Sequence, residues 1–232
     1  MRKTIACSAL ALSMATLAIS QDAVAKTAEQ APTIRTMSQI PQTRELGGNS
    51  TALVVIDFQN EYFSGRMPIP DGIKALNKAR QLVDFAHRHQ MPVFYVRHVG
   101  PADGPLFAQG SPFAEFHKDL RPGKGDSVIT KATPSSFVGT DLHQQLQHKG
   151  IKTLLVAGLM THMCVSSTAR DAVPLGYSVI IPEDATATRD LATWDNRVID
   201  HRVLQRSALA GVADVFAEIK TTQAVLAMPV KA

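Results

Sequence analysis

Apolar runs and amphipathic stretches alternate along most of the chain. The first run, 51–58, reads T-A-L-V-V-I-D-F and is rich in β-branched residues, which is typical of a strand buried on both faces. The stretch that follows, 71–90, carries apolar residues at helical spacing. The same alternation predicts further strands at 92–98, 126–131, 152–159, 177–182 and 213–216, and helices at 140–150, 164–176, 193–209 and 217–228.

Alternation of this kind indicates how the elements are arranged. Strands joined through helices form right-handed crossovers, which give a parallel sheet covered on both faces. Residues 26–49 are polar, contain Pro and Gly and show no clear period, so we expect an extended N-terminal arm there. Neither an internal repeat nor a linker divides the rest, and 50–232 is predicted to be one α/β domain.

The first 25 residues have the features of an export signal. Arg2 and Lys3 precede an apolar stretch over 5–19, which is too short to span a bilayer comfortably. A small-x-small site, Ala23-Val24-Ala25, follows it. We expect a secretory signal peptide over 1–25, cleaved after Ala25, and a periplasmic or secreted mature protein. The alternative is a buried N-terminal helix.

Composition narrows the range of partners. The 232-residue chain has a formal net charge of +4, its basic residues are scattered, and aromatic residues make up only 6%. These properties argue against nucleic-acid binding. No later apolar run is long enough to cross a membrane, so we expect a small-molecule partner, with neither nucleic acid nor membrane after processing.

The cysteine count raises a question about chemistry. Of the two cysteines, Cys7 lies in the predicted signal peptide and Cys164 remains alone. Exported proteins usually pair their cysteines or lack them. Cys164 is therefore an inert core residue, a partner in an interchain disulfide, or a thiol retained for chemistry.

Three chemically distinct side chains follow strands of the predicted sheet. Asp57 ends the first strand, Lys131 ends the third, and Cys164 follows the fourth. Ligands of parallel sheets bind beyond the carboxyl ends of the strands, so we expect these residues to converge on one edge. Taken singly, each has an ordinary structural interpretation: a loop-capping Asp, a surface Lys and a core Cys.

Together the three residue types suggest nucleophilic catalysis. A helix N-terminus and a nearby ammonium are expected to lower the pKa of the Cys164 thiol. Asp57 can accept the thiol proton and pass it to a leaving group, while backbone N–H groups stabilise an oxyanion. The pattern indicates a hydrolase that acts through a covalent thioester.

Four segments of the sequence carry a resemblance to a known family. They are V-V-I-D-F-Q-N-E-Y-F (54–63), V-I-T-K-A-T-P-S-S-F-V-G-T-D-L (128–142), L-V-A-G-L-M-T-H-M-C-V-S-S-T-A-R-D-A (155–172) and L-G-Y-S-V-I-I-P-E-D-A-T-A (175–187). Through them, most of 51–216 resembles the isochorismatase-like cysteine hydrolase family. The resemblance implies a Rossmann-like three-layer α/β/α sandwich with a six-stranded, mainly parallel sheet, and a triad of Asp57, Lys131 and Cys164. It also implies a non-proline cis peptide between Leu159 and Met160, with Gly158 giving the backbone freedom, and an oxyanion hole formed by the N–H groups of Met160 and Cys164.

The resemblance also bears on the reaction and on cofactors. Isochorismatases that cleave a vinyl ether lack the cysteine, so Cys164 places the chain with the amide-cleaving branch. Nicotinamidases hold a metal through an Asp-x-His pattern after the second strand. Arg97, His98 and Asp103 do not form that pattern, and we predict neither metal nor cofactor.

Candidate substrate contacts are predicted from their position beside the motifs. Phe58, Phe63, Phe137 and His162 lie close to the motifs and are candidate walls of a substrate pocket. Core packing is the alternative for the phenylalanines, and a solvent-facing turn is the alternative for His162.

The resemblance implies a homo-oligomer, a dimer or tetramer. Competing functions are a vinyl-ether hydrolase, a non-catalytic exported binding protein and a thiol redox sensor.

Overall fold

The computed structural model describes residues 27–231, in two units. The described part of the first unit, which ends at Pro32, contains the short 3₁₀ helix η1 (Ala28–Gln30). The second unit, Thr33–Ala232, contains every other described element. The predicted signal peptide, 1–25, lies outside the described residues.

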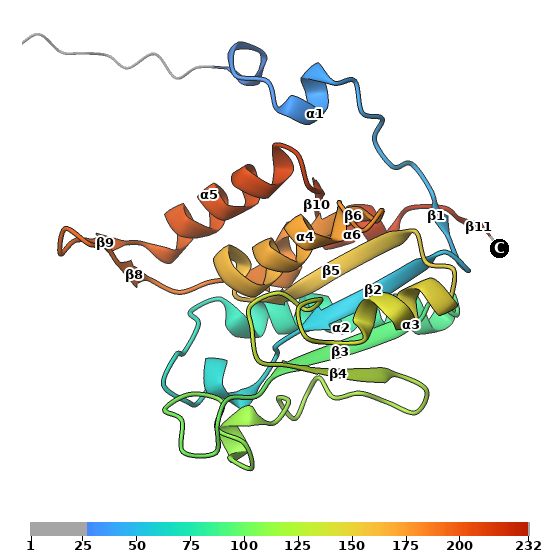
Figure 1. Ribbon diagram of the computed structural model, residues 1–232. Coiled ribbons are helices and arrows are strands. Elements are labelled where there is room, and N and C mark those ends of the chain that lie inside the picture. Colours follow the sequence, from blue (N-terminus) through green and yellow to red (C-terminus); the bar gives the residue numbers. More distant parts are fainter. Residues whose placement is uncertain (1–26, 232) are drawn as a thin grey trace, which may run out of the picture. The chain divides into compact units, whose positions relative to one another are not determined.

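A parallel sheet forms the centre of the second unit (Figure 1). Its strands lie in the order β10-β6-β5-β2-β3-β4, and every pair is parallel. If these six strands are renumbered 1 to 6 along the chain, their spatial order, read from β4 to β10, is 3-2-1-4-5-6. This is the order of Rossmann-type folds, and the expected six-stranded sheet is confirmed. A further short strand, β7, pairs with the end of β5. The strands are β2 (Thr51–Ile56), β3 (Val93–His98), β4 (Ser127–Lys131), β5 (Thr153–Leu159), β6 (Ser178–Pro182), β7 (Thr186–Ala187) and β10 (Glu218–Lys220).

Helices cover both faces of this sheet, because β2 has apolar side chains on both faces. Leu53 and Val55 belong to one apolar cluster, whereas Val54 and Ile56 belong to the other, because successive side chains of a strand point to opposite faces. The first cluster is covered by α2 (Gly72–Arg88) and α6 (Thr222–Leu226). The second is covered by α3 (Leu142–His148), α4 (Ser166–Ala172) and α5 (His201–Ala213).

The C-terminal third differs from the predicted elements. Residues 191–199 form an antiparallel hairpin, β8 (Leu191–Ala192) with β9 (Val198–Ile199), where a helix was predicted. Helix α5 starts only after Asp200, whose side chain accepts a hydrogen bond from Arg202 N–H and so caps it. Trp194, in the turn of the hairpin, is 95% exposed and packs on no core face.

The predicted strand at 213–216 is also wrong. Ala213 is the last residue of α5, and 214–216 form the turn after it, where Phe216 N–H donates to Val212 O at 2.7 Å. The sixth strand is instead β10, which occupies part of the predicted terminal helix, and α6 follows it. Apolar residues are dense throughout this region, so their spacing does not separate the end of a helix from a short strand.

The predicted arm is more regular than expected. It contains α1 (Ile34–Met37) and β1 (Leu46–Gly47), and β1 pairs in parallel with β11 (Val230–Lys231). Leu46 is buried and belongs to the first apolar cluster, so the end of the arm forms part of the domain. The remaining short helices are η2 (Asn60–Tyr62), η3 (Pro112–Ala114), η4 (Thr161–Val165) and η5 (Glu183–Ala185). Within 27–231, none of the helices has both the length and the apolar character that a membrane span needs.

Candidate active site

The three residues singled out in the sequence meet at the carboxyl edge of the sheet. Lys131 Nζ lies 2.7 Å from Asp57 Oδ2 and 3.4 Å from Cys164 Sγ. Asp57 directly follows β2, Lys131 ends β4, and Cys164 lies in η4, just beyond β5. Strands β2 and β5 are neighbours at the point where the strand order reverses, which is where open α/β sheets bind ligands. All three side chains are buried.

Asp57 is fixed by an unusual backbone conformation. Its φ angle is +54°, in the left-handed region that Asp tolerates better than most residues. Its N–H continues the sheet by donating to Val96 O at 2.9 Å. Neither carboxylate oxygen is engaged in a well-directed hydrogen bond among the described residues, so the short contact with Lys131 is mainly an ion pair. The carboxylate therefore has capacity to accept a proton.

Lys131 links the acid to the thiol. In addition to Asp57 and Cys164, its Nζ lies 3.1 Å from Thr133 O and 3.4 Å from His98 Nδ1. An ammonium has three donors and no acceptor. Lys131 thus gathers several acceptors around one buried positive charge.

The electrostatics of the thiol differ from the sequence-based prediction. Burial raises the pKa of the Cys164 thiol to about 12, and the Asp57 carboxylate adds to this increase while Lys131 opposes it. Burial likewise raises the pKa of the Asp57 carboxyl, against the lowering effect of Lys131. The expected lowering of the thiol pKa is therefore wrong, because desolvation outweighs the ammonium. Cys164 is a protonated thiol at rest and needs a base during attack.

The turn between β5 and η4 has the predicted backbone. The peptide bond between Leu159 and Met160 is cis. The Met160 carbonyl oxygen accepts from the N–H groups of Met163 and Val165, at 3.1 and 3.3 Å. Among the described residues, the Met160 N–H itself donates to no protein acceptor. The predicted oxyanion hole of Met160 and Cys164 N–H groups stays a prediction.

Gly158 has a different role from the one expected. A Cβ atom at this position would lie 2.6 Å from Ile56 Cβ and 2.8 Å from Ile56 O. Glycine is therefore required because β5 and β2 approach closely beside the site. Backbone freedom, the expected reason, does not account for it, since its φ is not among the positive values of the chain.

A cavity of about 300 Å³ opens onto Cys164. Its walls include His98, Met160 and Met163. The loop between β3 and β4 has no periodic pattern, so the wall residues that it contributes could not be predicted from the sequence. Four other wall residues lie in the motifs around Asp57, Lys131 and Cys164: Tyr62, Pro134, Met160 and Met163. The remaining wall residues are Met67, Gly100, Pro101, Gly104, Pro105, Leu106 and Phe107.

The four predicted substrate contacts lie outside this wall. Phe58 is 1% exposed and belongs to the apolar core, so its predicted role in substrate binding is corrected to packing. Phe63 lies against the ring of His117, and Phe137 stacks on Tyr177. His162 Nδ1 lies 2.6 Å from Thr188 Oγ1, which joins η4 to the segment after β7.

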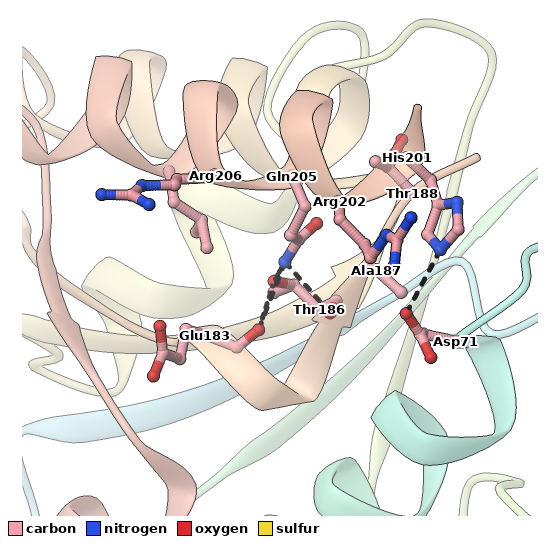
Figure 2. Close-up of a pocket in the computed structure, with 10 residues that line it drawn as sticks. Asp71, Glu183, Thr186, Ala187, Thr188, His201, Arg202, Gln205 and Arg206 are labelled. Atoms are coloured by element: carbon pink, nitrogen blue, oxygen red, sulfur yellow. Dashed lines mark hydrogen bonds and ion pairs between the residues drawn. The ribbon is translucent and has the colours of Figure 1, made fainter. Parts of the chain in front are cut away.

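A second cavity, of about 380 Å³, lies between α5 and the segment that follows β6. Figure 2 shows Gln205 reaching from α5 to the backbone of that segment. Its Nε2 donates to Glu183 O and Thr186 O, at 3.3 and 3.2 Å. No triad residue lines this cavity, and these contacts hold α5 against η5 and β7.

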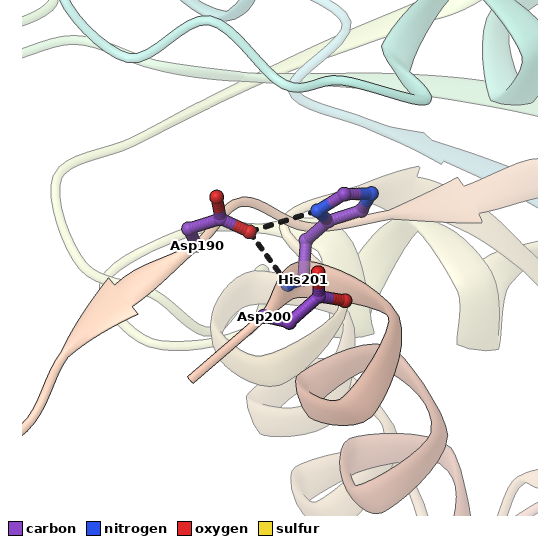
Figure 3. Close-up of side chains that lie close together, drawn as sticks. All are labelled: Asp190, Asp200 and His201. Carbon is purple, nitrogen blue, oxygen red and sulfur yellow. Dashed lines mark hydrogen bonds and ion pairs between the residues drawn. The ribbon is translucent and has the colours of Figure 1, made fainter. Parts of the chain in front are cut away.

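One group of the described side chains has the composition of a metal site. Asp190, Asp200 and His201 place ligand-type atoms within 4.8 Å of one another. Figure 3 shows that Asp190 is already hydrogen-bonded to His201, through the backbone N–H at 2.7 Å and Nδ1 at 2.8 Å. The group joins the loop before β8 to the start of α5. The prediction that no metal is used stays a prediction.

A parallel α/β sandwich with a buried cysteine, acid and lysine at its carboxyl edge defines a cysteine hydrolase. The isochorismatase domain model matches residues 51–223, and the chain belongs to the isochorismatase family.

Three relatives illustrate this membership. A secreted isochorismatase effector, Isc1, from Verticillium dahliae is 35% identical over 189 residues, which cover 82% of this chain and 96% of that protein. The crystal structure of an isochorismatase from Pseudomonas putida superposes with a TM-score of 0.77 at 34% identity, covering 82% of this chain and 97% of that one. The N-carbamoylsarcosine amidase of Thermoplasma acidophilum gives a TM-score of 0.66 at 31% identity, with coverage of 75% and 96%.

Proposed function

We propose that the protein hydrolyses a C–N bond of a small amide, ureido or carbamoyl compound through a thioester on Cys164. The observation that carries the proposal is the placement of Cys164 Sγ at the cavity wall, 3.4 Å from the Nζ that also contacts Asp57. The similarity to an amidase that acts on a carbamoyl compound supports the choice of a C–N bond.

In the acylation step, Sγ attacks the substrate carbonyl carbon and forms the C–S bond. The thiol proton passes to Asp57, whose raised pKa makes it a better acceptor. The N–H groups of Met160 and Cys164 stabilise the oxyanion. Asp57 then returns the proton to the leaving nitrogen, the C–N bond breaks, and an amine or ammonia departs.

In the deacylation step, water attacks the thioester carbonyl carbon. Asp57 accepts a proton from this water, and the C–S bond breaks as the tetrahedral intermediate collapses. The sulfur leaves as a thiolate beside the Lys131 ammonium and regains its proton from Asp57. Lys131 thus stabilises negative charge on the acid before attack and on the sulfur during it.

Ammonia release from a panel of small amides, ureas and carbamoyl compounds tests the proposal. Wild type should release ammonia, and Cys164→Ala should not, while circular dichroism and melting show that the variant is folded. Cys164→Ser is the matched control, because it keeps the shape of the nucleophile and loses its reactivity. Equal release by all three proteins contradicts the covalent mechanism. Vinyl-ether cleavage without ammonia would favour isochorismate-type chemistry instead.

We also propose that the protein is exported. The charged, apolar and small-residue regions of 1–25 support this, as does the similarity to a secreted fungal relative. Expression of the full chain followed by mass spectrometry tests it. A periplasmic or extracellular product that starts at Lys26 is expected, and an unprocessed cytoplasmic product contradicts it.

A further inference from the structure

We propose that His98 is a substrate-binding residue that donates a hydrogen bond from Nε2, and that its cavity selects an uncharged, largely apolar amide. This inference rests on the proposed function and specifies the substrate class of that site. Nothing in the triad chemistry itself requires His98.

The tautomer of His98 follows from its neighbour. His98 Nδ1 lies 3.4 Å from Lys131 Nζ, and an ammonium can only donate. A proton on Nδ1 would point at this positive charge, so we assign the lone pair to Nδ1 and the single proton of the neutral ring to Nε2. Among the described residues, Nε2 has no hydrogen-bond partner. A donor is thus left for a molecule in the cavity that His98 lines.

His98 is held through its backbone by Gln59 and through its ring by Phe107. The Gln59 side chain accepts from His98 N–H at 2.8 Å and donates to His98 O at 2.7 Å, so it replaces a missing strand partner. The imidazole also lies against the Phe107 ring, with centroids 5.1 Å apart. A donor with a fixed position costs little conformational entropy when a ligand binds.

The polar groups of the cavity are neutral near pH 7. Burial, together with the Lys131 ammonium, lowers the pKa of His98 to about 4. Burial also raises the pKa of the Tyr62 hydroxyl well above its usual value. The other described wall residues are glycines, prolines, Cys164 and the apolar side chains of Met67, Leu106, Phe107, Met160 and Met163.

An ionic ligand would meet no opposite charge on this wall. The Arg189 guanidinium, which together with burial lowers the pKa of His162, does not line the cavity and donates to Asp190 O at 3.0 Å. Transfer of an ion out of water without a partner is costly. The wall therefore fits an uncharged amide whose apolar body carries one hydrogen-bond acceptor for His98, within about 300 Å³.

Two alkylating probes of Cys164 test the charge preference. Iodoacetamide is neutral and iodoacetate is anionic, and the modified Cys164 peptide is quantified by mass spectrometry in the full chain. The ratio of the two rates cancels any change in the thiolate population. We expect this ratio to exceed that of free glutathione at the same pH by at least about tenfold. A ratio equal to that of glutathione, or a preference for iodoacetate, overturns the inference and favours an anion site at Arg189.

Variants of His98 test the hydrogen bond. His98→Leu removes the donor and should lower the ratio of the iodoacetamide rate to the rate of iodoethane, which carries no acceptor, by about fivefold, the effect of one hydrogen bond. Iodoacetate is no reference for this step, because its carboxylate accepts the same bond. His98→Gln keeps an N–H donor and should retain most of the ratio. An unchanged ratio in a folded His98→Leu protein contradicts the role of His98. These outcomes concern selectivity alone, whereas failure of the proposed function would appear as an inert thiol and no cysteine-dependent ammonia release.

Nitrogen NMR of the wild-type protein tests the tautomer without a variant. The ¹⁵N shifts of His98 should show a protonated Nε2 and an unprotonated Nδ1, with no titration between about pH 6 and 8. A protonated Nδ1, or a ring that titrates in that interval, overturns the inference.

Discussion

Lys131 Nζ and Asp57 Oδ2 form an ion pair 2.7 Å long, and both side chains are fully withdrawn from solvent. Cys164 Sγ lies 3.4 Å from the same ammonium. A buried pair of this kind is held by its partners and is sensitive to the loss of either. The thiol, the acid and the lysine therefore act as one electrostatic unit. Removal of the Asp57 charge and removal of the Lys131 charge should change the reactivity of the Cys164 thiol in opposite directions.

Asp57→Asn should separate nucleophile reactivity from turnover. Hydrolysis should fall at least about 100-fold because the general base is lost. Alkylation of Cys164 by iodoacetamide at pH 8 should become faster, because the Asp57 charge that raises the thiol pKa has been removed. The measurement compares the two rates on one preparation. Slower alkylation in a folded variant would contradict the assigned coupling.

Lys131→Met should act in the opposite direction on the thiol. Loss of the ammonium raises the thiol pKa further and slows alkylation. The variant should also lose about 3–5 kcal/mol of stability, since a buried carboxylate is left unpaired. Urea denaturation measures this loss. The double variant with Asp57→Asn is the control, and it should be more stable than Lys131→Met alone.

Alkylation of Cys164 should increase with pH without reaching a plateau at ordinary alkaline pH. The thiol pKa is about 12, so the thiolate fraction rises about tenfold for each pH unit below that value. Stopped-flow alkylation from pH 7 to pH 10 measures this dependence, on protein whose fold is checked at each pH. A plateau below pH 9 would indicate the lowered pKa that a helix N-terminus alone favours.

Hydrolysis should be lost on the acid side of neutrality. Asp57 accepts the proton only as a carboxylate, and burial raises the pKa of this group above its usual value of 3.8. As the pH falls through the raised pKa, the carboxylate becomes protonated and kcat/KM declines. A pH–rate profile on the active amide measures this limb. Activity that persists unchanged to pH 4 in folded protein would exclude Asp57 as the base.

Gly158→Ala should destabilise the protein by about 1–3 kcal/mol, because the new methyl group collides with Ile56 of the adjacent strand. Gly211→Ala is the matched control. Its Cβ would meet only Arg170 Nη2, at 3.6 Å, and alanine favours the helix by about 0.5–1 kcal/mol over glycine. Thermal unfolding should thus shift in opposite directions for the two variants, and a neutral Gly158→Ala would contradict the close approach of β2 and β5.

The sequence predicted the central sheet and the triad for one physical reason. Buried parallel strands have continuous apolar runs, and the residue that follows each run lies at the ligand-binding edge. Asp57, Lys131 and Cys164 could therefore be placed from order alone. The hairpin around Trp194 and the start of the last strand at Glu218 could not be predicted in this way, since a few apolar residues fit a helix and a strand equally well.

Most of the cavity wall and the protonation state of the thiol could not be predicted from the sequence, for a different reason. Leu106 and Phe107 reach the cavity through irregular backbone, whose path depends on contacts distant in the chain, such as Phe107 N–H with Glu61 Oε2. The thiol pKa depends on how completely Cys164 is buried. The presence of a helix terminus and a lysine was visible in the sequence, but the dominant desolvation was not.

The proposed mechanism requires that Cys164 becomes acylated during turnover. The most direct measurement is peptide mass spectrometry of wild-type protein, acid-quenched during steady-state hydrolysis of the amide that releases ammonia. A covalent mechanism predicts a Cys164 peptide that is heavier by the acyl group of the substrate. Hydroxylamine should remove this acyl group, and no such heavier peptide should form in Cys164→Ser. Rapid hydrolysis that Cys164→Ala retains, with an unmodified Cys164 peptide in the wild type, would contradict it.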